Sequence, residues 1–156
     1  MKITLLAVGR VMPPPIRELV EDYRERLNHF VPTRLESVAE EKRERGMTER
    51  LALEREGGRL RARFTPGAMI VALDGTGRML SSPELARTLG QWLDASPPEI
   101  LFLIGGPDGL DPAIKSRTHF TLSLGPMTYP HMLARVLVLE QLYRAMTLLR
   151  GVPYHR

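Results

Sequence analysis

The sequence predicts an α/β fold, with a mostly parallel sheet between helices, from three observations. Short β-branched and apolar runs alternate along the chain with segments of helical periodicity, which is the pattern of βαβ units. Several of these runs are continuously apolar, as is typical of buried strands. The chain has 156 residues, of which 43% are hydrophobic and 26% charged, and these values are typical of one globular domain spanning residues 1–156.

Five short apolar runs bounded by turn-forming residues have the length and composition of strands. They comprise residues 2–8, 33–39, 68–73, 99–104 and 120–124. The segments between and after them carry apolar residues at helical spacing or helix-capping residues. The predicted helices comprise residues 16–30, 47–63, 82–95, 111–117 and 133–150.

In the first half of the chain, prolines and charges set the limits of the helices. Three consecutive prolines, residues 13–15, exclude a helix at that point, and Pro32 ends the helix that follows. Residues 40–46 form a charged linker. The next helix alternates Arg with Glu, so we expect it to be exposed, and Gly57 with Gly58 weakens it.

In the second half, capping and turn residues define the elements. Residues 74–77 have the composition of a turn and end the third strand. Ser82 followed by Pro83 has the pattern of an N-cap and a first helical turn, and Pro97 lies beyond the end of that helix. Asp111 is placed to cap the short helix before the fifth strand.

The last helix, residues 133–150, is apolar over far more than the face that a surface helix buries. We therefore expect it to be covered on more than one side. A second copy of the chain would supply the additional cover, which predicts a homodimer. The alternative is a central helix that is covered within the monomer.

The composition excludes several classes of protein. The chain has no cysteine, which excludes disulfides and Cys-ligated zinc and favours the reducing cytoplasm. It shows neither the pattern of a signal peptide nor an apolar run long enough to cross a membrane, so we expect a protein with no membrane partner. The histidines lack metal-ligand spacing, so no metal is expected.

The distribution of charge permits a nucleic-acid partner. The formal net charge is +4, and residues 100–156 carry 6 Lys or Arg against 3 Asp or Glu. Most of the basic residues are Arg, whose planar guanidinium binds phosphate in a forked geometry. The alternative is a solvated surface of balanced charge.

Three predicted strands are followed by loops rich in glycine and proline, at residues 73–75, 104–109 and 124–130. Ligands bind beyond the carboxyl ends of the strands in an open α/β sheet, so we expect these loops to line one pocket. The sequence has no GxGxxG and no GxxxxGK[ST] motif. A Rossmann dinucleotide site and a P-loop are therefore disfavoured.

Two further features carry polar groups. His131, at the start of the last helix, is expected to be a cap or a hydrogen-bonded structural residue rather than a catalytic one. The last six residues, 151–156, place aromatic, imidazole and guanidinium groups at the C-terminus. Such a tail can stack on a base, move a proton and hold phosphate, or it can be a frayed end.

Several motifs together resemble the small SPOUT methyltransferases that modify N3 of a pseudouridine in large-subunit ribosomal RNA. The motifs are FLIGGPDGL at residues 102–110, LSLGPMTYPH at 122–131, RVL at 135–137, EQLYRA at 140–145 and PYHR at 153–156. The resemblance covers essentially the whole chain and is densest over its last 60 residues.

This resemblance implies a SPOUT fold with a C-terminal trefoil knot, a homodimer and S-adenosyl-L-methionine as cofactor. The implied substrate is 23S ribosomal RNA in the assembled ribosome. The alternatives are a SPOUT enzyme acting on another RNA, such as tRNA, and a non-catalytic RNA-binding assembly factor. The residues implied to bind the cofactor are Leu73, Gly105, Leu124, Gly125, Pro126, Met127, Thr128 and Tyr129.

The resemblance also implies that the C-terminal tail lies beside the target base. The catalytic residues are then Tyr154, His155 and Arg156. Either His155 or ionised Tyr154 would assist removal of the N3 proton. Arg144 or Arg156 would bind RNA and stabilise negative charge.

Overall fold

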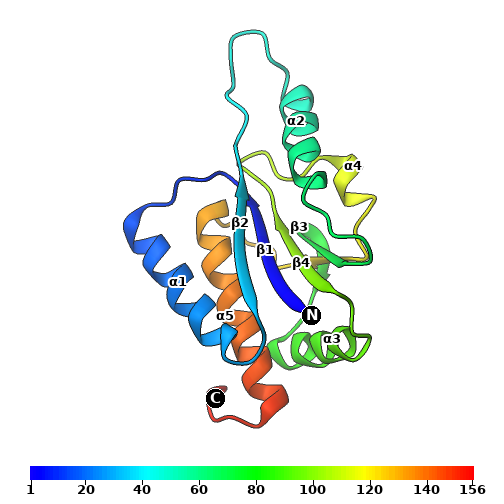
Figure 1. Ribbon diagram of the computed structural model, residues 1–156. Coiled ribbons are helices and arrows are strands. Elements are labelled where there is room, and N and C mark those ends of the chain that lie inside the picture. The colour runs from blue at the N-terminus through cyan, green and yellow to red at the C-terminus, as the bar shows by residue number, and fades with distance from the viewer.

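The computed structural model describes residues 1–156 and contains one five-stranded sheet with helices on both faces (Figure 1). The strand order is β2-β1-β4-β3-β5, and every neighbouring pair is parallel. The strands are β1 (Lys2–Val8), β2 (Thr33–Val38), β3 (Met69–Met79), β4 (Glu99–Ile104) and β5 (Phe120–Ser123). The predicted α/β class is confirmed, and the sheet is parallel throughout.

The helices are divided between the two faces of the sheet. They are α1 (Pro14–Asn28), α2 (Glu49–Arg61), α3 (Ser82–Asp94), α4 (Pro112–Lys115) and α5 (His131–Arg150). The first, third and fifth helices share one hydrophobic core with the sheet, and α2 and α4 share the other. No helix is both long enough and apolar enough to cross a membrane.

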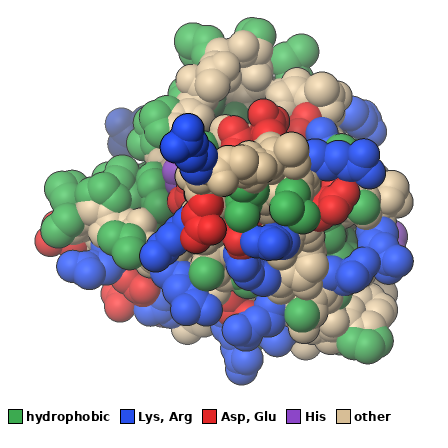
Figure 2. Space-filling model, turned by 90° about the horizontal axis from the view of Figure 1, so that it is seen from above, with side chains coloured by type: hydrophobic (Ala, Val, Ile, Leu, Met, Phe, Trp, Pro, Cys, Tyr) green, Lys and Arg blue, Asp and Glu red, His purple; other side chains and the backbone are tan.

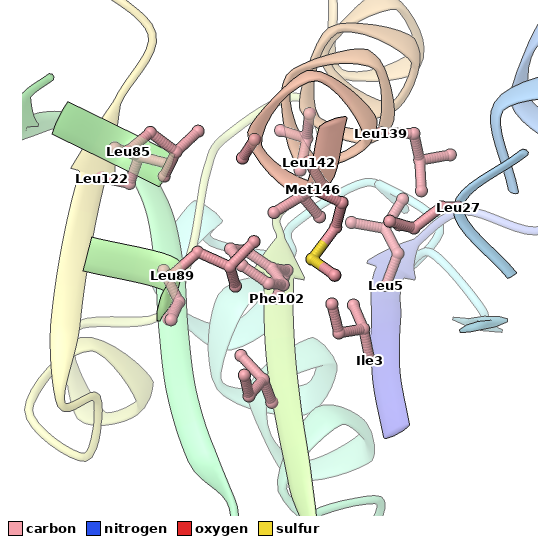
Figure 3. Packing of buried hydrophobic residues seen from close by; sticks show 14 of the residues in the cluster. Ile3, Leu5, Leu27, Leu85, Leu89, Phe102, Leu122, Leu139, Leu142 and Met146 are labelled. Atoms are coloured by element: carbon pink, nitrogen blue, oxygen red, sulfur yellow. The ribbon is translucent and has the colours of Figure 1, made fainter. Parts of the chain in front are cut away.

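The two cores follow from the alternation of side chains along each strand. In β1, Ile3 and Leu5 point into the core under α5, whereas Leu6 and Val8 point into the core under α2. Figure 3 shows the first of these cores, with side chains of α1, α3 and α5 around Phe102 of the central strand. The middle strands are therefore buried on both faces.

The helix α5 packs along the sheet between α1 and α3 (Figures 1 and 3). Eight of its residues are buried: Arg135, Val136, Val138, Leu139, Leu142, Ala145, Met146 and Thr147. Packing within one chain therefore accounts for much of its hydrophobicity. The prediction of a homodimer needs a different argument, which the position of the tail supplies below.

The first helix begins earlier than predicted, and the cap of the third helix is one residue earlier than predicted. Pro14 and Pro15 form the first turn of α1, where a missing N–H costs nothing because the first helical N–H groups have no intrahelical partner. In α3 the N-cap is Ser81 rather than Ser82, and Ser81 forms a capping box with Glu84. The exclusion of a helix at the prolines and the assignment of Ser82 as cap were therefore wrong.

The helix before β3 was predicted to be exposed, which is wrong for one of its faces. Glu56 and Gly57 are buried in α2, and a Cβ atom at residue 57 would lie 2.9 Å from the Cβ of Asp111. Gly57 is thus the residue that lets α2 approach α4. Gly58 has open space around it, so only its neighbour has this packing role.

The turn predicted after the third strand is an irregularity inside a longer strand. The pairing of β3 with β5 shifts between Leu73 and Arg78, both of which lie opposite Leu122. A Cβ atom at Gly77 would lie 2.6 Å from the carbonyl oxygen of Thr121, so only glycine fits this close approach. The shift places residues 74–76 beyond the regular ladder, at the end of the sheet where the other strands finish. The trefoil knot stays a prediction.

Candidate active site

The three loops singled out in the sequence meet at the carboxyl end of the sheet and line one cavity of about 330 Å³. All eight residues expected to bind the cofactor line this cavity, which we call the loop pocket: Leu73, Gly105, Leu124, Gly125, Pro126, Met127, Thr128 and Tyr129. They meet because parallel strands that finish at the same edge bring their following loops together.

The loop after β4 is a tight turn that depends on glycine. An isolated bridge joins Gly106 to Gly109, and Gly109 has a φ of +83°, in the region that glycine favours. A Cβ atom at Gly105 would lie 2.3 Å from the carbonyl oxygen of Gly109. The turn therefore exposes backbone rather than side chains to the pocket.

The loop after β5 is fixed by a side chain of its own strand. The Ser123 hydroxyl accepts a hydrogen bond from the N–H of Gly125 at 3.1 Å and donates to the carbonyl of the same residue at 3.2 Å. Gly125 has a φ of +116°. This local arrangement turns the chain sharply away from the strand, so that residues 124–129 form one wall of the pocket.

Asp74 is a pocket residue to which the sequence analysis gave no role. Its carboxylate accepts hydrogen bonds from the N–H and hydroxyl of Thr76 and from the Lys115 ammonium at 3.1 Å. Burial works to raise the pKa of Asp74, but these hydrogen bonds outweigh it and hold that pKa below its ordinary value. The sequence signal that could have identified Asp74 as a pocket residue was its position directly after a buried strand.

His131 lines the same pocket and does not cap α5. The residue before the helix is Pro130, which makes no side-chain cap, and the His131 Nε2 atom is buried without a hydrogen-bond partner. Burial lowers the pKa of His131, and the neighbouring Arg135 guanidinium lowers it further. His131 was predicted to be a cap or a hydrogen-bonded structural residue. It is not the cap, and its Nε2 atom makes no hydrogen bond within the chain, so the prediction was wrong for this atom.

A second hollow, of about 380 Å³, adjoins the loop pocket between the end of β3, the start of α3 and α5. The two hollows share Leu122, Leu124, Gly125 and Tyr129. The second is lined mainly by apolar side chains, and it does not include the loop after β4. The backbone hydrogen-bonding groups that a nucleoside needs are therefore concentrated in the loop pocket.

The C-terminal tail is anchored rather than frayed. The Tyr154 hydroxyl donates to a carboxylate oxygen of Glu140 at 3.0 Å, and its ring packs edge-on against Tyr143 with 4.7 Å between centroids. The Arg144 guanidinium lies 4.7 Å from the centre of the Tyr154 ring. Arg144 also donates from Nε to Glu140 at 3.0 Å and lies 3.3 Å from His155 Nδ1.

The tail cluster comprises Glu140, Tyr143, Arg144, Tyr154 and His155, and it shifts the pKa values of Tyr154 and Arg144. Burial raises the pKa of Tyr154 well above its ordinary value, and the Glu140 carboxylate acts in the same direction. The hydrogen bond to Glu140 likewise raises the pKa of Arg144. At neutral pH the phenol is therefore protonated, which disfavours ionised Tyr154 as a base.

The tail cluster and the loop pocket are separate within one chain. None of Arg144, Tyr154, His155 and Arg156 lines the pocket. Glu140, which holds the tail, is nine residues after His131, or about 14 Å along the helix axis. The structure gathers the loop residues around the pocket and places Arg144 beside Tyr154 and His155, but it does not bring these two groups together.

Two comparisons define the class of protein. Residues 1–155 match a family model described as a predicted SPOUT methyltransferase. A probable methylase family protein from Haemophilus influenzae Rd KW20 has a similar fold, with a TM-score of 0.56 at 12% sequence identity, over 99% of this chain and 70% of that one. The fold and the sequence thus define a SPOUT methyltransferase.

Curated relatives define the family within that class. The ribosomal RNA large subunit methyltransferase H of Rhodospirillum centenum is 47% identical over 100% of this chain and 99% of its own length. The protein of the same name from Ruegeria pomeroyi is 40% identical with the same coverage. The chain belongs to the family of ribosomal RNA large subunit methyltransferase H. It is accordingly a methyltransferase, and its cofactor is S-adenosylmethionine.

The loop pocket has the properties that this cofactor requires. Its volume lies in the range of small-molecule sites, and its glycine-rich walls offer backbone N–H and carbonyl groups to an adenine and a ribose. Polar side chains, among them Asp74 and His131, stand at its border. When bound, the cofactor supplies a methyl group on a positively charged sulfur, which is already a strong electrophile.

Proposed function

We propose that the protein methylates N3 of a pseudouridine in 23S ribosomal RNA of the assembled ribosome, as a homodimer, with S-adenosylmethionine held in the loop pocket. The observation that carries this proposal is the family itself, because relatives named ribosomal RNA large subunit methyltransferase H match the whole chain at 40–47% identity. Assembled ribosomes make the cytoplasm the proposed compartment. The pocket and the tail cluster supply the two kinds of chemistry that such a transfer needs.

The chain's own task in this reaction is to handle a proton and a negative charge. The N3–H of pseudouridine is a weak acid, so the nitrogen becomes a good nucleophile as its proton leaves. We assign proton removal to His155, whose Nδ1 faces the Arg144 guanidinium at 3.3 Å. Arginine only donates hydrogen bonds, so Nδ1 is the accepting nitrogen in this contact, and Arg144 must release it before His155 can take the proton. Arg144 and Arg156 then stabilise the developing anion or a nearby phosphate.

Tyr154 has a positioning role in this proposal. Its phenol stays protonated and donates to Glu140, which also pairs with Arg144. The ring packs between Tyr143 and the Arg144 guanidinium. Tyr154 thereby holds the segment that carries His155 and Arg156, instead of taking the proton itself.

The separation of tail and pocket is the reason for proposing a homodimer. One chain holds its tail cluster on α5, about 14 Å along the helix from the start of the pocket. In a two-fold dimer the contacts are reciprocal, so if the tail of one protomer meets the pocket of the other, the same contact forms a second time with the roles exchanged. We propose that the tail of one protomer completes the pocket of its partner. Both regions expose apolar side chains, which fit such an interface. They are Met79 and Met127 beside the hollows and Val152 in the tail.

The charge around the pocket favours an assembled particle over naked RNA. Figure 2 views the molecule from the end at which the strands finish, and Lys and Arg side chains there alternate with Asp and Glu side chains. Exposed Arg10 follows β1, whereas the segment after β2 carries Lys42 and Arg45 together with Glu44. A surface with so few unopposed cations makes few phosphate contacts. The shape of the assembled particle and contacts from the second protomer must then supply the rest of the RNA recognition.

The test is methyl transfer from labelled S-adenosylmethionine to whole ribosomes, separated subunits and bulk tRNA from cells that lack this gene. We expect label only in whole ribosomes, at an N3-methylated pseudouridine identified by mass spectrometry of the mapped fragment. Label in tRNA would contradict the substrate and favour a SPOUT enzyme for another RNA. Cofactor binding without any label would favour a binding-only assembly factor.

A further inference from the structure

Three buried polar atoms beside the loop pocket have no hydrogen-bond partner in the chain: Glu56 Oε2, His131 Nε2 and Arg135 Nε. Glu56 and Arg135 are almost completely buried, with exposed fractions of 2% and 3%. Buried polar groups in proteins are nearly always hydrogen-bonded, because an unpaired group loses its contact with water without compensation. Three such atoms in one place therefore point to a polar ligand.

The three side chains that carry these atoms come together where β1 and β4 end. A Cβ atom at Gly9 would lie 3.4 Å from Arg135 Nη2 and 3.8 Å from His131 Nε2. A Cβ atom at Gly106 would lie 3.7 Å from Glu56 Oε2. The parallel register pairs Ala7 with Ile104, so the continuing chains place the two glycines beside each other. Gly106 and His131 also line the loop pocket.

Each charged side chain is anchored at one end and open at the other. The Arg135 Nη2 atom donates to the carbonyls of Val8 at 2.7 Å and Gly9 at 2.8 Å, which leaves its Nε–H unused. The Glu56 Oε1 atom accepts from the N–H of Glu41 at 2.9 Å and from Arg43 at 3.3 Å, which leaves Oε2 unused. These anchors fix the side chains in advance of any ligand.

We propose that this cluster binds the amino-acid end of S-adenosylmethionine, with the α-carboxylate on His131 and Arg135 and the α-ammonium on Glu56. The inference rests on the proposed cofactor pocket and adds three residues to it. The hydrogen-bond donors His131 and Arg135 match the carboxylate of a zwitterion, and the acceptor Glu56 matches its ammonium. A zwitterion also adds no net charge to a site that already contains one buried guanidinium and one buried carboxylate.

The location agrees with the order of groups along the cofactor. The walls of the loop pocket made by residues 73–75 and 124–129 offer mainly backbone groups and apolar side chains, which suit a nucleoside. The charged cluster adjoins the pocket at Gly106 and His131. The charged end of the ligand is therefore matched to the buried charged side chains beside the pocket that each keep one unpaired polar atom.

The experiment compares three ligands by isothermal titration calorimetry. S-adenosylhomocysteine carries both charged groups, S-adenosyl-3-thiopropylamine carries the amine alone, and 5′-methylthioadenosine carries neither. For the wild-type protein we expect affinity to fall in that order, by about tenfold or more for each charged group lost, because charge-assisted hydrogen bonds have about that value. Glu56→Gln should weaken the first two ligands about tenfold and leave 5′-methylthioadenosine unchanged.

The other variants separate the two charged groups and control for folding. His131→Phe should weaken S-adenosylhomocysteine alone, since it removes a donor to the carboxylate and keeps a planar ring. Glu41→Gln is the matched control, because its carboxylate pairs with Arg55 and Arg59 in the adjoining ion network and does not face the space. That variant should bind all three ligands as the wild type does.

Two results would overturn the inference. If Glu56→Gln weakens 5′-methylthioadenosine as much as S-adenosylhomocysteine, the residue only supports the fold of the pocket. If neither Glu56→Gln nor His131→Phe changes any affinity, a buried water satisfies the three atoms. A wild-type protein that binds none of the ligands would instead contradict the cofactor pocket and with it the proposed function.

Discussion

The two ends of α5 differ in how their polar side chains are satisfied. Near the C-terminus, Arg144 and Tyr154 both donate hydrogen bonds to Glu140 in the tail cluster. At the N-terminus, His131 and Arg135 keep buried nitrogen atoms that have no partner in the chain. The same helix thus carries a closed network at one end and an open one at the other.

This difference indicates what each end does before substrates arrive. A closed network holds a short segment in one geometry, which a tail that positions a catalytic group requires. An open network of buried donors and acceptors is stable only with a ligand or water in place. We therefore propose that the pocket end is arranged for binding and the tail end for chemistry, and that a second protomer brings them together.

The largest expected effect comes from removing the tail end. Deletion of residues 154–156 should lower methyl transfer to ribosomes by about a thousandfold, in the range that a positioned proton acceptor contributes. Cofactor affinity should stay unchanged, because none of these residues lines the pocket. Single-turnover transfer and calorimetric binding of S-adenosylhomocysteine measure the two quantities. Transfer at the wild-type rate would refute the assignment of the tail.

The next largest effect comes from a test of whether each active site combines the pocket of one protomer with the tail of the other. Gly105→Ala should abolish cofactor binding, because its Cβ would lie 2.3 Å from the Gly109 carbonyl oxygen and distort the loop. Gly58→Ala is its control, since that position has open space and Ala favours a helix interior. A heterodimer of the Gly105→Ala chain and the tail-deleted chain then keeps one intact pocket and one intact tail, on different chains.

Co-expression with two affinity tags yields this heterodimer in pure form. We expect about half of the wild-type transfer rate, because one of its two composite sites is complete. The parent homodimers should both be inactive. An inactive heterodimer that still binds cofactor would mean that each tail serves the pocket of its own chain.

The contrast between the two ends also separates what the sequence could predict from what it could not. The loop pocket was predictable, because three continuous apolar strands end in glycine-rich loops and parallel strands finish at one edge. Glu56 was not predictable, since it is one of several glutamates in a helix of alternating charge, and only packing against the loop after β4 buries it. The adjacent Gly57 was the available signal of close approach, and it was interpreted as a weakness of the helix.

The tail shows a second limit of the same kind. Its residues were identifiable as a group with aromatic, basic and imidazole side chains. Their distance from the pocket depends on the direction of a 20-residue helix and on where the chain turns back, which no local pattern encodes. The hydrophobicity of α5 suggested a partner chain, whereas α1 and α3 cover much of that helix within one chain.

The smallest expected effect concerns the alkaline stability of the tail end. The pKa of Tyr154 is raised in the folded protein above the ordinary tyrosine value near 10, so the folded state keeps a proton that the unfolded chain loses. The stability linked to this proton is fully present below pH 10 and declines as the pH rises from there toward the raised pKa. Tyr154→Phe has no such proton, so its free energy of unfolding should decline less than that of the wild type between about pH 9 and 11.

Urea unfolding at several pH values measures the difference, with Tyr129→Phe as the control because Tyr129 lies in the pocket wall outside the tail cluster. Parallel pH profiles for wild type and Tyr154→Phe would show that the pKa of Tyr154 is not raised in solution, which would contradict a buried, hydrogen-bonded phenol at this end of α5.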